Sequence, residues 1–264
     1  MKFNGGLQVL GMVALAALGA SVALADPPAT PPVSKFAPID DLATQIELYV
    51  KEIDTALVNP AEYDEVKKAK VKKQANTVTA LALNLGLHDE DHPLKSAAPA
   101  LIQASQALAK ASDNAEQAAA ARDALKKALT AEPAAGELAW KRIASQGQLM
   151  KQVNTLNARL KRSVTPQRFK RSAKEAAGDA ATMAAIGQVV LFDTHEVKNE
   201  ADLPKWYELS GEFRDICGAL NAACRGGDQA QAAELIKKLN QSCHACHQVF
   251  RQNLVNQPPA EAAE

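Results

Sequence analysis

The residues with the clearest chemistry are the five at positions 243–247, which read Cys-His-Ala-Cys-His. This is the C-x-x-C-H pattern through which a c-type haem is attached to a protein. Two thiols three residues apart lie on one side of a helical turn, where each can form a thioether with a haem vinyl group. The His that follows directly can then ligate the iron. The motif predicts one covalent haem c, held by Cys243 and Cys246, with His247 as an axial iron ligand.

A metal site is the competing interpretation of these residues, since Cys243, His244, Cys246 and His247 are all zinc ligands by type. A tetrahedral zinc site needs a second ligand pair from elsewhere, because two adjacent pairs on one helix cannot surround the ion. Haem attachment is therefore the favoured interpretation, and His244 is expected to face solvent.

The first 25 residues are organised like a secretory signal peptide. Lys2 precedes an apolar run from Leu7 to Leu24, and Ala23-Leu24-Ala25 forms a cleavage site before Asp26. A membrane anchor is the alternative, but the run is short and contains several Gly and Ala residues. We expect cleavage after Ala25, a periplasmic location and no membrane span in the mature chain. That compartment fits haem attachment, which takes place outside the bacterial cytoplasm.

Composition and periodicity indicate an all-α protein. Aromatic residues make up only 4% of the chain, and apolar residues recur at i, i+3, i+4 and i+7 with no period-two runs. Residues 26–140 carry 12 Lys and Arg against 17 Asp and Glu, a net charge of −5. Residues 141–264 carry 17 against 13, a net charge of +4. Nucleic-acid binding is not expected, because neither a large positive excess nor stacking aromatics are present.

The helical pattern divides into two sets of four segments. The predicted segments are Asp40–Leu57, Pro60–Leu87, Lys95–Ser112 and Ala115–Thr130, then Glu137–Ser163, Pro166–Phe192, Pro204–Arg225 and Asp228–Val255. Asn59-Pro60 and Thr165-Pro166 match at an offset of 106 residues, each read as an N-cap followed by Pro at the first helical position. This repetition predicts two tandem antiparallel four-helix bundles rather than one continuous array.

The predicted domain limits follow from this division. The two bundles span residues 39–133 and 137–255. The Pro-rich residues 26–38 are expected to form an extended, mobile leader, and residues 256–264 a flexible tail.

The second half, from about residue 140 to 255, resembles the cytochrome c′ family. The resemblance rests mainly on the last segment, in which Gly227-Asp228 precedes the haem motif and Phe250-Arg251 follows it. Leu203-Pro204-Lys205-Trp206, followed by Phe213, is similar to the aromatic start of the family's third helix. The resemblance implies a four-helix bundle with one haem on its last helix, acting in one-electron transfer or in binding NO or CO.

The first half departs from that family pattern. Where a haem motif would fall, around Glu132 to Gly136, it has neither Cys nor His, so a haemless bundle is expected. Family members often pair as dimers through their first two helices. A haemless copy in front could occupy the partner position, which predicts an internal pseudo-dimer or a homodimer, and the opposite charges of the halves would favour such docking.

The residue opposite His247 decides the chemistry of the iron. The family presents a residue of the first bundle helix there, and either Leu149 or Met150 fits. A Met ligand would give a low-spin electron carrier, whereas an apolar side chain would leave the iron open to small gases. Arg251 is a candidate neighbour of the proximal face or a propionate, with a solvated surface Arg as the alternative. Trp206 and Phe213 are expected to form the wall of the haem pocket.

Three further sets of residues bear on function. Cys217 and Cys224 are too far apart along one helix for a disulfide and are expected to be buried thiols. A basic run at 159–174 is either a solvated face or a docking surface for the acidic half or an acidic redox partner. The runner-up functions are a haem peroxidase, which has no assignable distal His or Arg, and a haem-bearing interaction protein whose first bundle recruits a partner.

Overall fold

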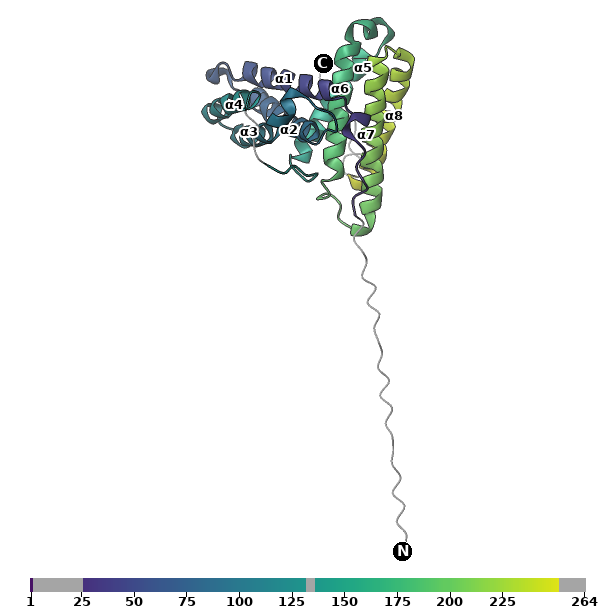
Figure 1. Cartoon of the computed structure of the whole chain (residues 1–264). Helices are drawn as coiled ribbons and strands as arrows, with labels where there is room; N and C mark the ends of the chain where they lie inside the picture. The colour runs from purple at the N-terminus through teal and green to yellow at the C-terminus, as the bar shows by residue number, and fades with distance from the viewer. Residues whose placement is uncertain (2–25, 132–135, 252–264) are drawn as a thin grey trace.

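The computed structural model describes residue 1 and residues 26–131 and 136–251 (Figure 1). Over these residues the chain forms eight α-helices and no strand, which confirms the all-α prediction. The predicted signal peptide and the predicted flexible tail fall outside the described residues. No helix in the described part is both long and apolar enough to cross a membrane.

The helices follow the predicted order with shifted ends. They are α1 (Ile39–Ala56), α2 (Glu65–Gly86), α3 (Ala98–Ala111), α4 (Ala115–Ala128), α5 (Gln146–Ser163), α6 (Pro166–Leu191), α7 (Leu203–Arg225) and α8 (Gln229–Phe250). Four short 3₁₀ turns accompany them: η1 (Val33–Lys35), η2 (Pro60–Glu62), η3 (Pro93–Ala97) and η4 (Glu200–Asp202).

The two Pro-initiated helices of the sequence prediction turn out differently. Pro166 does occupy the first turn of α6, as predicted. Pro60 instead opens η2, and α2 begins only at Glu65, because the Asp64 carboxylate accepts a hydrogen bond from the Lys67 N–H at 2.8 Å and caps the helix. The start of α5 is also displaced, from the predicted Glu137 to Gln146.

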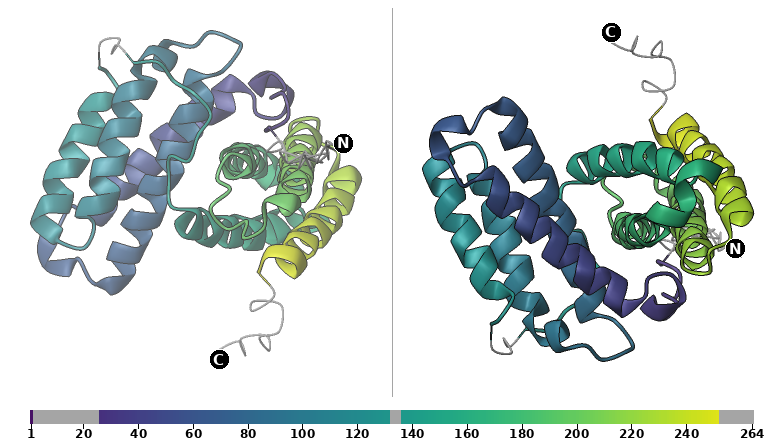
Figure 2. Two further views of the ribbon diagram at one scale, coloured as in Figure 1. Left: turned by 90° about the horizontal axis from the view of Figure 1, so that it is seen from below. Right: turned by 90° about the horizontal axis from the view of Figure 1, so that it is seen from above.

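Helices that follow one another in sequence pack against one another in space. Within α1–α4 and again within α5–α8, each helix contacts the next, and the two sets meet where α1 and α2 lie against α5 and α6. Figure 2 shows α1–α4 on one side of the molecule and α5–α8 on the other. A continuous layer of buried side chains joins the two sets.

Polar contacts also cross the boundary between the two sets. The Asn84 side-chain amide donates to the Ala185 carbonyl at 3.1 Å, and the Asn221 amide donates to Asp41 at 2.6 Å. Arg225 pairs with the same Asp41 carboxylate at 2.9 Å. Such buried hydrogen bonds are directional, so they fix the orientation of one set relative to the other.

Part of the predicted mobile leader is packed into the structure, which corrects that expectation. Val33, Phe36 and Ala37 are buried, and the backbone of Phe36 lies so close to Gly218 of α7 that a Cβ there would be 2.9 Å from the Phe36 Cα. Ser34 bonds Asp89 through both its N–H and its hydroxyl. The leader therefore contacts the loop after α2 as well as α7.

Candidate functional site

A cavity of about 590 Å³ lies among α5, α6, α7 and α8, inside the size range of small-molecule and cofactor pockets. Its lining is mostly apolar, and it carries Cys243, Cys246 and His247 on one wall. The sequence-predicted haem residues therefore face an internal space rather than bulk solvent.

The geometry of α8 explains this placement. Leu235 and Leu239 are buried and hold the helix against the core, so the residues one to two turns later on neighbouring faces border the cavity. Cys243, Cys246 and His247 are half-buried. His244 is exposed at the rim, as expected from the sequence.

Burial sets the protonation of the three groups. Burial raises the pKa of the Cys246 thiol to about 11, with the neighbouring Cys243 adding to the effect, and burial also raises the pKa of Cys243. The pKa of His247 is lowered, first by burial and then by Arg251 and His244. At neutral pH the wall therefore offers two protonated thiols and a neutral imidazole, whose free ring nitrogen is the form that binds iron.

Two hydrogen bonds define how α5 and α8 face each other across the cavity. The Gln229 amide at the start of α8 donates to the Val164 carbonyl after the end of α5 at 2.8 Å, so the helices are antiparallel. The Asn157 amide donates to Asn240 at 3.0 Å. Moving seven residues along each helix from that pair brings Met150 opposite His247.

The structure separates the two candidates for the sixth iron ligand. Met150 lines the cavity and is half-buried. Leu149 is 1% exposed, belongs to the core and is not part of the cavity wall, so its assignment as a site residue is not supported. Adjacent residues on a helix point about 100° apart, which is why only one of them faces the cavity.

Aromatic side chains close another wall of the cavity. Trp206 is 2% exposed, its indole N–H donates to the Val190 carbonyl at 3.2 Å, and its ring meets Phe250 edge-on with centroids 5.0 Å apart. Phe213 lines the cavity one to two turns further along α7. Both predicted wall residues, Trp206 and Phe213, are thus in place.

A chain of charged groups at the cavity rim was missed by the sequence analysis. Arg251 pairs with Glu196, and both line the cavity. Glu196 lies 3.2 Å from His195, whose other ring nitrogen is 2.5 Å from the buried Asp193. Arg251 is therefore held by a protein carboxylate and is not a freely solvated surface residue. The loop that supplies these partners has no periodic pattern from which their meeting could be predicted.

Unpaired buried polar atoms concentrate at this cavity. In the described part of the chain, seven buried side-chain atoms have no hydrogen-bond partner, and four of them belong to cavity-lining residues. These four are Gln146 Oε1, Asn157 Oδ1, Ser210 Oγ and Ser242 Oγ. Buried polar atoms without a hydrogen-bond partner are typical of a cavity that binds ordered water or a ligand with polar groups. Together with the thiols and the neutral imidazole, they fit a haem, which is apolar over most of its surface and polar at its propionates.

Other candidate groups do not form a site. Cys217 and Cys224 are unpaired and buried in α7, as predicted, and neither lines the cavity. Within the described ranges no group of three or more His, Cys, Asp or Glu could hold a metal ion. The zinc alternative therefore has no second ligand pair there.

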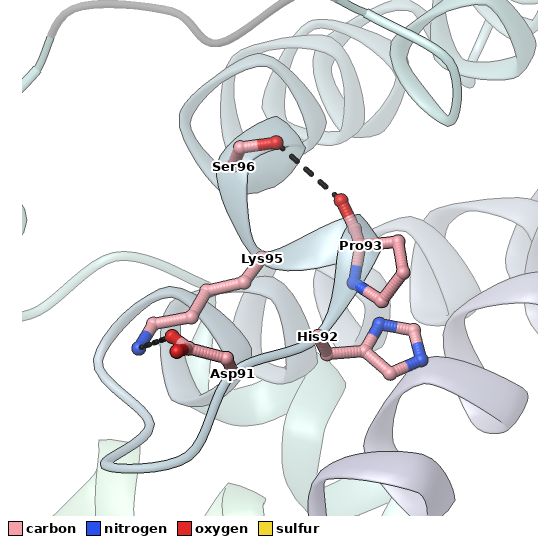
Figure 3. A pocket seen from close by; sticks show the side chains of 5 residues that line it. All are labelled: Asp91, His92, Pro93, Lys95 and Ser96. Carbon is pink, nitrogen blue, oxygen red and sulfur yellow. Dashed lines mark hydrogen bonds and ion pairs between the residues drawn. The ribbon is translucent and has the colours of Figure 1, made fainter.

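A second hollow lies on the first half, beside η3 (Figure 3). It is shallow, and its polar groups bond to one another or to nearby backbone. Lys95 approaches Asp91 at 3.7 Å, and the Ser96 hydroxyl donates to the Pro93 carbonyl at 3.4 Å. The His92 ring accepts the Leu94 N–H at 3.0 Å.

Comparison with known proteins returned no relative: no protein family, no curated protein and no solved structure matches this chain.

Proposed function

We propose that this protein is an exported c-type cytochrome of the cytochrome c′ kind, with one haem in the cavity between α5 and α8. The observation that carries the proposal is the joint position of Cys243, Cys246 and His247 on one wall of a largely apolar cavity. A solvent-exposed C-x-x-C-H motif with no adjoining space would not support it.

Each residue of the wall has a distinct part in holding the group. Cys243 and Cys246 supply the two thiols for thioether bonds, and His247 supplies a neutral imidazole to the iron. Trp206, Phe213 and Phe250 exclude water from the ring. When bound, the haem supplies a reversible one-electron change at its iron.

One-electron transfer is the function we favour. Met150 faces His247 across the cavity, and a Met–His ligand pair leaves no open iron position. The main alternative is binding of NO or CO, which needs Met150 to pack beside the ring without ligating. A peroxidase function has less support, because α5 places neither His nor Arg on the cavity wall opposite His247.

We further propose that α1–α4 and α5–α8 are tandem four-helix bundles derived from one unit, the first without haem. In this proposal the contacts of α1 and α2 with α5 and α6 form an internal pseudo-dimer. A role of the first bundle in recruiting a partner is the second candidate.

The test is to express the full chain together with a c-type haem attachment system and record spectra. We expect a covalent haem band in the periplasmic fraction and a reduced spectrum that carbon monoxide leaves unchanged. Cys243→Ser combined with Cys246→Ser should abolish the band, and Cys224→Ser serves as the matched control. Wild-type protein without covalent haem would overturn the proposal, and a spectrum shifted by carbon monoxide would favour gas binding.

A further inference from the structure

The connection between α5 and α6, at the upper end of the molecule in Figure 1, carries an unusual concentration of positive charge. Six basic side chains there are exposed. They are Lys161, Arg162, Arg168, Lys170, Arg171 and Lys174, here called the α5–α6 basic patch. Between residues 160 and 175 the only acidic residue is Glu175.

The patch takes no part in holding the fold together. None of its six side chains has an ion-pair or hydrogen-bond partner among the residues that the structure describes. By contrast Arg159, the first residue of the same basic run, forms an ion pair with the buried Asp179. Arg159 thus links α5 to α6, whereas the six patch residues that follow it in sequence are exposed to solvent.

One member of the patch, Arg168, lies where it opposes helix stability, whereas Lys161 and Arg162 lie in the last turn of α5, where the helix dipole favours cations. The positive end of the helix dipole lies at the start of α6, where acidic residues are favoured and basic ones are not. The first turns of α1, α2 and α4 follow this preference with Asp40 and Asp41, Glu65 and Glu116. The first turn of α6 has no acidic residue, as is also true of α3, α5, α7 and α8, and it carries Arg168.

Spacing within α6 adds repulsion. Arg168 and Arg171 are three residues apart, and Lys170 and Lys174 are four apart, so like charges lie next to each other on the helix surface. The like charges within α6 therefore lower its stability slightly and have no partner among the described residues, which leaves the patch available to an external one.

One end of the patch lies near the α5 wall of the cavity. Lys161 follows Asn157 by about one helical turn, and Asn157 lines the cavity. A partner seated on the patch would lie at the α5–α6 end of the bundle that holds the cavity.

We propose that the α5–α6 basic patch is the docking surface for an acidic redox partner protein. That the partner is a redox protein rests on the proposed function, but docking to the patch does not itself require haem. Complementary charge favours an acidic protein surface, which would steer association and make it depend on salt. An anionic membrane is less favoured, because the exposed large apolar residues of the described part, Met1, Leu48, Val58, Val66 and Val249, all lie outside the patch.

The test uses the purified full chain with a labelled polyglutamate peptide as the acidic probe. Arg168→Glu with Arg171→Glu should abolish peptide binding and raise the melting temperature, because the carboxylate at 168 complements the helix dipole and both changes remove like-charge repulsion within α6. Lys110→Glu with Lys127→Glu changes the net charge equally in the last turns of α3 and α4 and should leave binding intact. Wild-type binding should fall steeply as salt is raised.

Three outcomes would overturn the proposal. Equal loss of binding in both double variants would mean that net charge alone is responsible. Unchanged binding in the α6 variant would mean that the patch is only a solvated face. Tighter binding to vesicles of phosphatidylcholine and phosphatidylserine than to the peptide would mean that the occupant is a membrane. The haem spectrum of the same preparations reports separately on the proposed function.

Discussion

Met150 and Leu149 are neighbours in sequence with opposite environments, and this difference can be tested directly. Met150→Ala should leave the fold intact and open the iron, so that carbon monoxide shifts the reduced spectrum. Leu149→Ala should leave the spectrum unchanged but lower the free energy of unfolding by about 2–5 kcal/mol, because it empties a packed core position. Spectra and urea titrations of both variants measure this. The assignment of Met150 fails if its removal leaves the response to carbon monoxide unaltered.

Asp89 gives a prediction for acid conditions. Burial raises its pKa, but the two hydrogen bonds from Ser34 outweigh burial and lower the pKa to about 2. A depressed carboxyl pKa stabilises the fold above the unfolded value of 3.8, and this contribution is lost as the pH falls through about 2. Asp89→Asn should therefore cost about 1 kcal/mol at neutral pH, since the side chain is partly exposed and screened.

Thermal melts of wild type and Asp89→Asn from pH 6 down to pH 2 test this linkage. The difference between them should shrink only below about pH 4. Asp91→Asn is the control, because Asp91 lies fully exposed in the same loop and should have little effect at any pH. A difference that stays constant down to pH 2 would show that the Ser34–Asp89 contact is not responsible.

At the scale of elements, the approach of α6 to α7 shapes the cavity. A Cβ at Gly187 would lie 2.8 Å from the Phe213 ring and 3.2 Å from the Arg214 backbone. Gly187→Ala should therefore force the helices apart, displace an aromatic wall residue and cost about 1–3 kcal/mol. Thermal unfolding and the haem spectrum together measure both effects.

Gly147→Ala is the matched control for that substitution. Gly147 also lies in a helix beside the cavity, but a Cβ there would meet nothing within 4 Å. Its replacement should stabilise α5 by roughly 0.5–1 kcal/mol, because Ala loses less backbone entropy than Gly in a helix. If both variants destabilise equally, close packing at Gly187 is not the cause.

The helices show which structural features could be predicted from the sequence. Helices were found wherever apolar periodicity was long, and ends were correct where a local signal determines them, as at Pro166 and at Gly226-Gly227-Asp228. The predicted start of the second helix at Pro60 was wrong, because Pro60 opens a 3₁₀ turn and the Asp64 cap starts α2 five residues later.

Within the site, the C-x-x-C-H residues are close together in sequence and could be recognised from it. The choice between Leu149 and Met150 depends on the register of α5 against α8, which the sequence does not determine. The Glu196–Arg251 pair joins a loop to the end of α8, so it could not be predicted from sequence either.

At the scale of the whole molecule, we expect the two sets of helices to unfold as one unit. Asp41 accepts from Asn221 and pairs with Arg225, and the Asn221 amide also donates to the Ala177 carbonyl. Asp41→Ala therefore removes one of the two acceptors of this buried amide and should cost about 1–3 kcal/mol. Asp40→Ala is the control, because Asp40 is exposed and shares the same first turn of α1. Denaturant titrations monitored by haem absorbance and by helical content measure both effects. Two separate transitions in the wild type would contradict this expectation.

The packed leader has a consequence for the order in which the chain can fold. Phe36 lies against Gly218, and Asp41 bonds a residue 180 positions away, so part of the packing of residues 33–41 depends on α7. Contacts this distant in sequence require closure of a long loop and form late. During synthesis Phe36 therefore has no α7 to pack against until most of the chain has been made. The apolar face of α1 packs mainly on α2 and α6, so it is fully covered only once α6 has formed, and until then its uncovered part carries a risk of aggregation.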